Sequence, residues 1–96
     1  MKDADESPDD HLARSFGRCV TRHREAAGQS MASLASIAGL SRAYLWRIEE
    51  GKSLPNLRNA ARLAAALEMP LSTLVEGLDL SKVQLENRPY DGAREG

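Results

Sequence analysis

The side chains best able to recognise another molecule cluster near the middle of the chain. Arg42, Ala43, Trp46 and Arg47 fall within six consecutive positions, and the apolar residues between them belong to the other side of a helix. An arginine can donate two parallel hydrogen bonds to O6 and N7 of guanine, and an alanine can pack against the methyl group of thymine. A helix face that only meets water usually mixes acids, lysine and glutamine. These residue types therefore predict a surface suited to the major groove of DNA.

A second pair, Cys19 and His23, stands four residues apart and could be read as a nucleophile beside a base. No third group is available to orient the pair, and the spacing places it on the inward side of a helix, where small thiols are commonly buried. His11 and His23 have no acid or thiol at metal-ligand spacing. The sequence therefore predicts a non-enzymatic protein with no catalytic residue, no metal and no cofactor.

The length and composition of the chain narrow its class further. Ninety-six residues leave room for one compact domain, and four aromatic residues mean that leucine, alanine, isoleucine and valine must build most of the core. No apolar run approaches the roughly 18 residues that cross a bilayer. The acidic start lacks a secretory signal, and a single cysteine allows no internal disulfide. We therefore expect a cytoplasmic protein, associated with the nucleoid if it binds DNA, and no membrane partner.

Charge is distributed unevenly although the formal net charge is −1. Residues 1–11 carry one lysine and five acids, residues 12–62 carry nine basic residues and three glutamates, and residues 63–96 carry three basic and six acidic groups. The basic centre fits a polyanionic partner, and it also fits ordinary surface decoration. The same two alternatives, phosphate contact or solvent-facing charge, stay open for the arginines that recur every four residues at Arg14, Arg18 and Arg22.

Apolar residues recur every three or four positions along most of the chain, which predicts helices. Ser30, Ser41 and Asn56 stand where N-caps would begin three of them, and a glycine follows each of the first three helices as a terminator. A weak alternating pattern at residues 82–85 would suit one strand. The fold class that follows is an all-α bundle of five helices, over residues 12–27, 31–38, 42–50, 57–67 and 71–78.

The stretch of residues 30–51 has the layout of a helix-turn-helix. Two short helices flank a three-residue turn, in which Gly39 permits a left-handed backbone, Leu40 is apolar enough to anchor the turn, and Ser41 caps the next helix. Helices joined in this way cross steeply and present the second helix to solvent. A generic helical corner could share this spacing, but the arginine-bearing outer face of residues 42–50 favours the helix-turn-helix.

At residues 35–52 the chain resembles the XRE family of helix-turn-helix regulators, relatives of the lambda and 434 repressors and Cro, through the run ASIAGLSRAYLWRIEEGK. The resemblance covers residues 13–78, and the leucines that follow Pro55 match the usual fourth and fifth helices. It implies a five-helix, lambda-repressor-like domain that binds operator DNA, commonly as a dimer, and regulates transcription.

The resemblance also implies roles for individual residues. Arg42, Ala43 and Arg47 fall at base-reading positions, and Trp46 beside them would either stack on sugar or a thymine methyl, or pack back onto the preceding helix. Met31 replaces the glutamine that often begins the second helix, so only its backbone amide would meet phosphate. Six residues are expected to contact the DNA backbone: Ser30, Met31, Tyr44, Lys52, Asn56 and Arg58.

One implied interaction is structural. Glu49 falls where the family typically has a carboxylate paired with an arginine of the first helix, which here is Arg24. Such a pair would fix the recognition helix, and it would shield an acid that would otherwise repel phosphate.

Three regions follow from this interpretation: an acidic flexible arm over residues 1–10, a helix-turn-helix DNA-binding domain over residues 11–79, and a C-terminal extension over residues 80–96. The last helix and the extension carry more apolar residues than a short helix needs, and surplus apolar strips often mark partner surfaces. We expect a homodimer contact there, followed by a frayed tail. The contact residues would be Leu74, Leu78, Leu80, Val83 and Leu85.

The resulting hypothesis is a sequence-specific regulator of transcription, a homodimer that reads a pseudo-palindromic operator in double-stranded DNA through the helix over residues 42–50. Activation would add a contact with RNA polymerase, and repression would block a promoter; the sequence chooses neither. The alternative is a protein-interaction module on the same fold, an antitoxin or adaptor, with DNA binding secondary. The acidic arm and the apolar C-terminal residues support that alternative.

Overall fold

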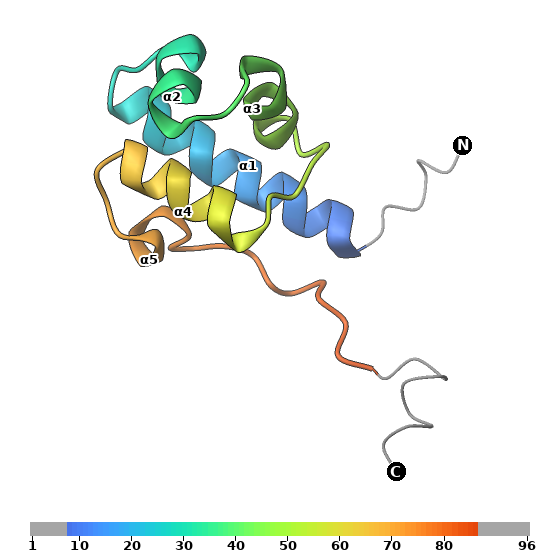
Figure 1. Ribbon diagram of the computed structural model, residues 1–96. Helices are drawn as coiled ribbons and strands as arrows, with labels where there is room; N and C mark the ends of the chain where they lie inside the picture. The colour runs from blue at the N-terminus through green and yellow to red at the C-terminus, as the bar shows by residue number, and fades with distance from the viewer. Residues whose placement is uncertain (1–7, 87–96) are drawn as a thin grey trace.

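The computed structural model of the protein describes residues 8–86. In that part of the chain it consists of five α-helices and contains no strand, which confirms the all-α fold class (Figure 1). The weak alternating pattern at residues 82–85 does not form a strand, because this segment makes no ladder with a neighbour. The helices are α1 (Pro8–Ala26), α2 (Met31–Ala38), α3 (Arg42–Glu49), α4 (Leu57–Ala66) and α5 (Leu71–Leu74).

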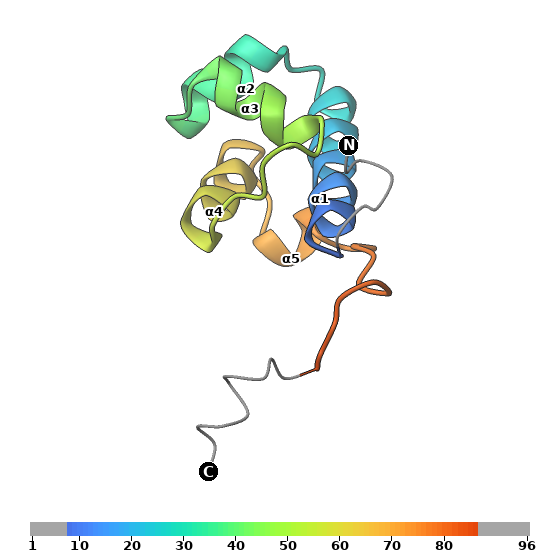
Figure 2. The ribbon, with the colours of Figure 1, turned by 90° about the vertical axis from the view of Figure 1, so that its right-hand side faces the viewer.

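The helices enclose one apolar core. Helix α1 is the longest and runs along one side of the bundle, α2 and α3 lie together at one end, and α4 and α5 close the remaining sides (Figure 2). Every helix contributes at least one side chain with no exposed surface, which is why none of them is dispensable for the core. These side chains are Val20, Leu34, Leu45, Ile48, Leu63 and Leu74.

The predicted turn between α2 and α3 forms as expected. Gly39 adopts a left-handed backbone with φ of 74°, and the N–H of Leu40 donates to the carbonyl oxygen of Ala35 at 2.9 Å. Ser30 and Ser41 are the N-caps of α2 and α3, since each hydroxyl accepts a hydrogen bond of 3.0 Å from the backbone N–H three residues later. The two helices of the helix-turn-helix thus begin and end where their capping residues predict.

Two helix boundaries differ by several residues from the sequence-based expectation, and the ends of α1, α3 and α4 each come one residue earlier than expected. Helix α1 begins at Pro8, so the last three residues of the expected acidic arm are helical; a proline has the fixed φ that suits a first helical position. Residues 1–7 of the arm and residues 87–96 of the expected frayed tail lie outside the described residues. Helix α5 ends at Leu74, because residues 75–77 form a turn that brings Leu78 back onto the core.

The end of α3 docks on α1 more closely than two helices with side chains at the contact could. A Cβ added to Gly17 would meet the carbonyl oxygen of Ile48 and would lie 2.7 Å from that of Glu49. Gly51, with φ of 76°, would place a Cβ 2.9 Å from the Cα of Arg14. Glycine on both sides of the contact therefore fixes how far α3 stands from α1.

We expect Gly17→Ala to lower the free energy of unfolding by about 1–3 kcal/mol, the usual cost of overpacking. The sign is informative, because alanine in place of a helical glycine normally stabilises by about 1 kcal/mol. Urea denaturation of the two proteins measures the difference. A more stable Gly17→Ala variant would show that α3 does not depend on this close approach.

Candidate nucleic-acid interface

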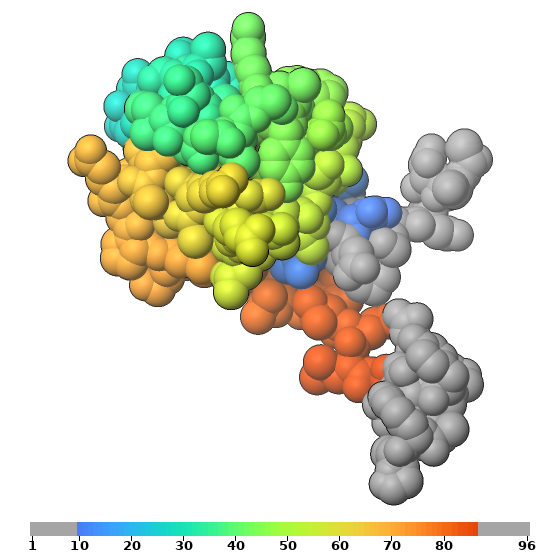
Figure 3. Space-filling model, in the orientation of Figure 1, coloured from blue at the N-terminus to red at the C-terminus, as the bar shows by residue number. Residues whose placement is uncertain are grey.

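The outward side of α3 carries the four residues singled out for base reading. Arg42, Ala43, Trp46 and Arg47 are all exposed, Trp46 at 45%. Leu45 and Ile48, on the opposite side of the same helix, are completely buried. In Figure 3 the surface of α2 and α3 continues without a break into the α3–α4 loop and the start of α4. A long molecule lying on α3 would therefore also meet these neighbouring segments.

The residues expected to touch a DNA backbone lie on α2, on α3, in the α3–α4 loop and at the start of α4. Lys52 and Arg58 are exposed, in the α3–α4 loop and in the first turn of α4. Ser30 and Asn56 are exposed N-caps, and the side-chain oxygen of Asn56 accepts a hydrogen bond of 2.8 Å from the N–H of Asn59. The side chain of Met31 instead packs against the core. Its backbone N–H is therefore the group left for a phosphate contact.

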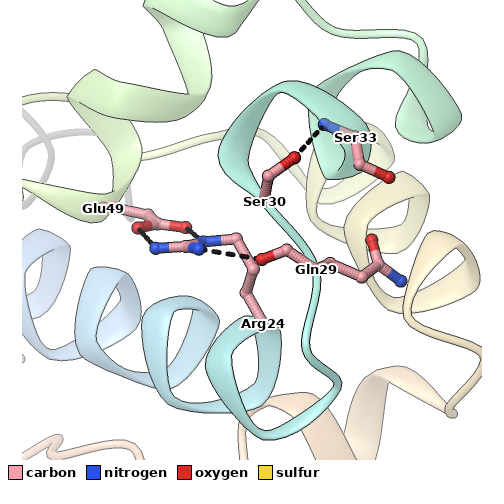
Figure 4. Close-up of polar contacts among 5 residues, drawn as sticks. All are labelled: Arg24, Gln29, Ser30, Ser33 and Glu49. Carbon is pink, nitrogen blue, oxygen red and sulfur yellow. Dashed lines mark hydrogen bonds and ion pairs between the residues drawn. The ribbon is translucent and has the colours of Figure 1, made fainter.

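Arg24 and Glu49 form a two-pronged ion pair across the end of α3 (Figure 4). Nε of Arg24 donates to Oε2 of Glu49 at 2.7 Å, and Nη2 donates to Oε1 at 3.1 Å. Nη1 of Arg24 also donates to the carbonyl oxygen of Gln29 at 3.0 Å. The pKa of Arg24 is raised above its usual value, chiefly because Glu49 accepts these hydrogen bonds from the charged guanidinium.

This pair withdraws the one glutamate of α3 from the interface. The side chain of Glu49 is 4% exposed and that of Arg24 is 14% exposed, so the negative charge is both neutralised and removed from solvent. Because Arg24 also holds the backbone of Gln29, the contact joins α1, the α1–α2 loop and α3. The pair therefore sets the position of α3 and the sign of the charge around it.

A second network, not anticipated from the sequence, connects α3 to the α3–α4 loop and to α4. The guanidinium carbon of Arg47 lies 5.5 Å from the ring centroid of Tyr44, and Nε of Arg47 donates to Oγ of Ser53 at 3.4 Å. The hydroxyl of half-buried Tyr44 accepts a hydrogen bond of 3.3 Å from Nδ2 of Asn59. Ser53 and Asn59 carry no sequence signal for this role, because their positions depend on the path of the loop.

The arginine row on α1 is not a purely cationic flank. Arg18 and Arg22 line an open hollow of about 550 Å³ at the seam between α1 and the end of α3, together with Thr21, Glu25, Glu49 and Glu50. Three acids therefore share this hollow with the two guanidinium groups. Of the two alternatives that the sequence left open, the mixed charges favour local solvation over a dedicated phosphate contact.

The expected dimer residues are divided by the structure. Leu74 is completely buried in the core, so its assignment to the dimer contact is wrong: the apolar stripe of α5 faces the bundle. Leu78 is partly buried against the same core. Leu80, Val83 and Leu85 are 60%, 39% and 91% exposed, on an extension that leaves the body of the molecule (Figure 1).

The start of this extension is fastened to the beginning of α1. Nε2 of His11 lies 2.8 Å from Oδ2 of Asp79, and the N–H of Asp79 donates to Oγ of buried Ser15 at 3.0 Å. The N–H of Ser81 donates to Oδ1 of Asp79 at 2.9 Å. The pKa of Asp79 is lowered, because Ser81, through its side chain and its backbone, and then His11 form hydrogen bonds with the carboxylate.

The remaining candidate groups form no site. Cys19 is buried, and Nε2 of His23 is buried without a hydrogen-bond partner among the described residues. Across residues 8–86 no three side chains of histidine, cysteine, aspartate or glutamate come together as metal ligands. Nor does any helix in this range combine the length and apolarity that crossing a membrane requires.

Two short helices joined by a tight turn in a five-helix bundle, with a cationic face on the second, define a lambda-repressor-like helix-turn-helix domain. The chain belongs to this family, because the family model described as a helix-turn-helix domain matches residues 15–78. The resemblance to XRE regulators noted from the sequence is thereby confirmed.

Individual relatives agree with this assignment. The chain is 32% identical over 66 residues to the HTH-type transcriptional regulator SutR of Escherichia coli, and the match spans 69% of this chain and 37% of that protein. The restriction-modification controller protein C.AhdI of Aeromonas hydrophila superposes with a TM-score of 0.63 at 34% identity, over 65% of this chain and 94% of that one. An HTH_3 family transcriptional regulator of Vibrio cholerae reaches 0.67 at 27% identity, over 70% of this chain and 38% of that one.

Breaking the ion pair from the acidic side should be costly. We expect Glu49→Ala to reduce the free energy of unfolding by about 2–4 kcal/mol, because it leaves the guanidinium of Arg24 poorly solvated and unpaired. Glu50→Ala, at the exposed neighbour, should change it by less than about 0.5 kcal/mol. Urea unfolding of both variants makes the comparison, and equal small losses would remove the pair from its structural role.

Proposed function

We propose that the chain binds double-stranded DNA in a sequence-specific manner and regulates transcription, with α3 lying in the major groove. The observation that carries the proposal is the outward face of α3. It presents two arginines and an alanine to solvent, while the one glutamate of that helix is paired with Arg24 beneath it. A helix whose outward face carries two arginines, on a rigid support, suits a polyanion whose base edges accept hydrogen bonds.

The exposed groups divide into readers and clamps. Arg42 and Arg47 suit guanine, Ala43 suits the methyl group of thymine, and Trp46 would lie at the edge of the groove. Phosphate contacts would come from Lys52, Arg58, the hydroxyl of Tyr44, and the backbone N–H groups that begin α2 and α4. Readers determine which sequence is bound, and clamps hold any duplex in register.

A homodimer would supply the second half of the binding site. Leu80, Val83 and Leu85 form an exposed apolar row, and the fastening of Asp79 to His11 and Ser15 holds the start of that row against α1. Two copies joined through these rows would place two α3 helices on one side of the duplex. Half-sites about one helical turn apart, on a pseudo-palindromic operator, would match such a dimer.

A protein-interaction module on the same fold is a second candidate. The same apolar row favours it, because exposed leucines and valine can also receive a different protein. This candidate differs from DNA reading in one consequence: the arginines of α3 would not matter for its activity. Substitution of these arginines therefore separates the two functions.

Readers and clamps should fail in different ways. We expect Arg47→Ala to cost about 1–3 kcal/mol of binding to a duplex enriched from a random pool, and to relax the preference at one base pair. Lys52→Ala should weaken matched and scrambled duplexes alike and lower the salt dependence by about one phosphate contact. Arg18→Ala, which removes an exposed arginine of α1 that lies beside Glu25 and Glu50, is the matched control and should change neither.

Binding is measured by fluorescence anisotropy of labelled duplexes over a range of salt concentrations. If Arg47→Ala and Lys52→Ala had the same effect on matched and scrambled duplexes, the division into readers and clamps would be incorrect. If neither variant differed from the wild type, α3 would not be the DNA-binding element.

The dimer contact predicts a change of mass. Leu80→Ser combined with Leu85→Ser should convert a dimer to a monomer, because it removes the apolar area that two copies would bury. Ile37→Ser, at a 61% exposed position on α2, is the matched control and should leave the dimer intact. Sedimentation velocity reads the mass directly, and an unchanged mass in the double variant would exclude this row as the interface.

The fastening of the row should weaken only in acid. The pKa of Asp79 is lowered in the folded chain. The stabilisation that its ionised carboxylate gives to the start of the extension is therefore complete above the ordinary aspartate pKa of about 3.9. This stabilisation is lost as the pH falls through the lowered pKa. Asp79→Asn should therefore weaken the dimer at neutral pH in the same sedimentation experiment.

A further inference from the structure

The guanidinium of Arg47 is held on two sides, unlike that of Arg42. One side lies over the ring of Tyr44, with 5.5 Å between the guanidinium carbon and the ring centroid. On the other, Nε donates to Oγ of Ser53 at 3.4 Å. The side chain of Arg42 forms no hydrogen bond or ion pair with any residue in the described range. The two arginines of the same exposed face therefore differ in how far their side chains are ordered in advance.

Both supports of Arg47 are themselves anchored. The ring of Tyr44 packs against the core, and its hydroxyl accepts a hydrogen bond of 3.3 Å from Asn59 on α4. Ser53 is brought back to Arg47 by the chain, because the backbone N–H groups of Lys52 and Ser53 both donate to the carbonyl oxygen of Arg47, at 2.8 and 3.3 Å. A change of rotamer at Arg47 would thus have to break its contacts with Tyr44, which packs on the core, and with Ser53 in the loop.

The choice of nitrogen in the Ser53 contact has a consequence for recognition. A guanidinium has five N–H donors: one on Nε and two on each terminal nitrogen. With Nε directed at Ser53, the two terminal nitrogens form the free edge of the fork. Two parallel hydrogen bonds from that edge match the N7 and O6 acceptors of guanine. A fork fixed in this direction loses less rotamer freedom when it binds.

We propose that Ser53 and Tyr44 are positioning residues for Arg47, and that they set the preference for guanine at one base pair of the bound DNA. This inference rests on the proposed function and adds residues that read no base themselves. Ser53 fixes which edge of the guanidinium points away from the protein, and the ring of Tyr44 fixes its plane.

The test uses a duplex enriched from a random pool by the wild-type chain, together with every single-base-pair substitution of that duplex. Ser53→Ala should reduce the preference for guanine at the base pair read by Arg47 about 3- to 10-fold, the size of a modest coupling between contacting residues. Its affinity for a scrambled duplex and its salt dependence should stay as in the wild type. Ser72→Ala, an exposed serine on α5, is the matched control and should leave all preferences unchanged.

Two further comparisons show whether Ser53 acts through Arg47. In an Arg47→Lys background, Ser53→Ala should have no further effect, because lysine has no Nε fork to direct. Tyr44→Phe retains the ring and should retain the guanine preference, whereas Tyr44→Leu should lose it. A purely structural role of Ser53 would instead weaken all duplexes by the same factor. The Tyr44 variants are compared by their guanine preference alone, because loss of the Tyr44 hydroxyl should also weaken all duplexes.

Three results would overturn the inference alone: an unchanged guanine preference in Ser53→Ala, an equal loss from Ser53→Ala with and without Arg47, or a uniform loss from Ser53→Ala across all duplexes. If the wild-type chain enriched no duplex from a random pool, the proposed function would be overturned, and the positioning role with it. The two failures are therefore distinct.

Discussion

The ion pair between Arg24 and Glu49 is the contact on which the interface depends. A carboxylate at the end of α3 would repel a phosphate backbone, and a carboxylate buried without a partner would destabilise the fold. Its two hydrogen bonds, of 2.7 and 3.1 Å, remove both problems. Because Arg24 holds the carbonyl of Gln29 as well, the same guanidinium joins α1, the α1–α2 loop and α3. The side chain of Arg24 thus both stabilises the position of α3 and neutralises the negative charge of Glu49.

Close packing then converts this pair into a defined geometry. The absence of a side chain at Gly17 lets the backbone of α3 approach α1, and Gly51 allows the chain to leave α3 beside Arg14. Helix α3 is consequently held by its inner side and by its end, which leaves its outer side free for recognition. The contacts of Arg47 with Tyr44 and Ser53 extend the same order to a side chain that we propose to read bases. Precision at the surface follows from constraints beneath it.

Much of this arrangement follows from local sequence rules, and the errors have physical causes. Caps at Ser30 and Ser41 and the turn at Gly39 locate the helix-turn-helix, because these signals act within a few residues. Leu74 is misassigned because periodicity identifies an apolar stripe without indicating whether the stripe faces the core or a partner. Ser53 and Asn59 escape prediction because their contacts bridge separate elements. The partner of Glu49 emerged only through a family resemblance.

Trp46 can report directly on whether the outer face of α3 engages DNA. It is the only tryptophan of the chain, it lies on that face, and it is 45% exposed. Titration with a mixed-sequence duplex at low salt should change its fluorescence, and added salt should reverse the change as counterions compete for the phosphates. Fluorescence that stays constant at low salt, with duplex in large excess over protein, would show that the outer face of α3 does not engage DNA.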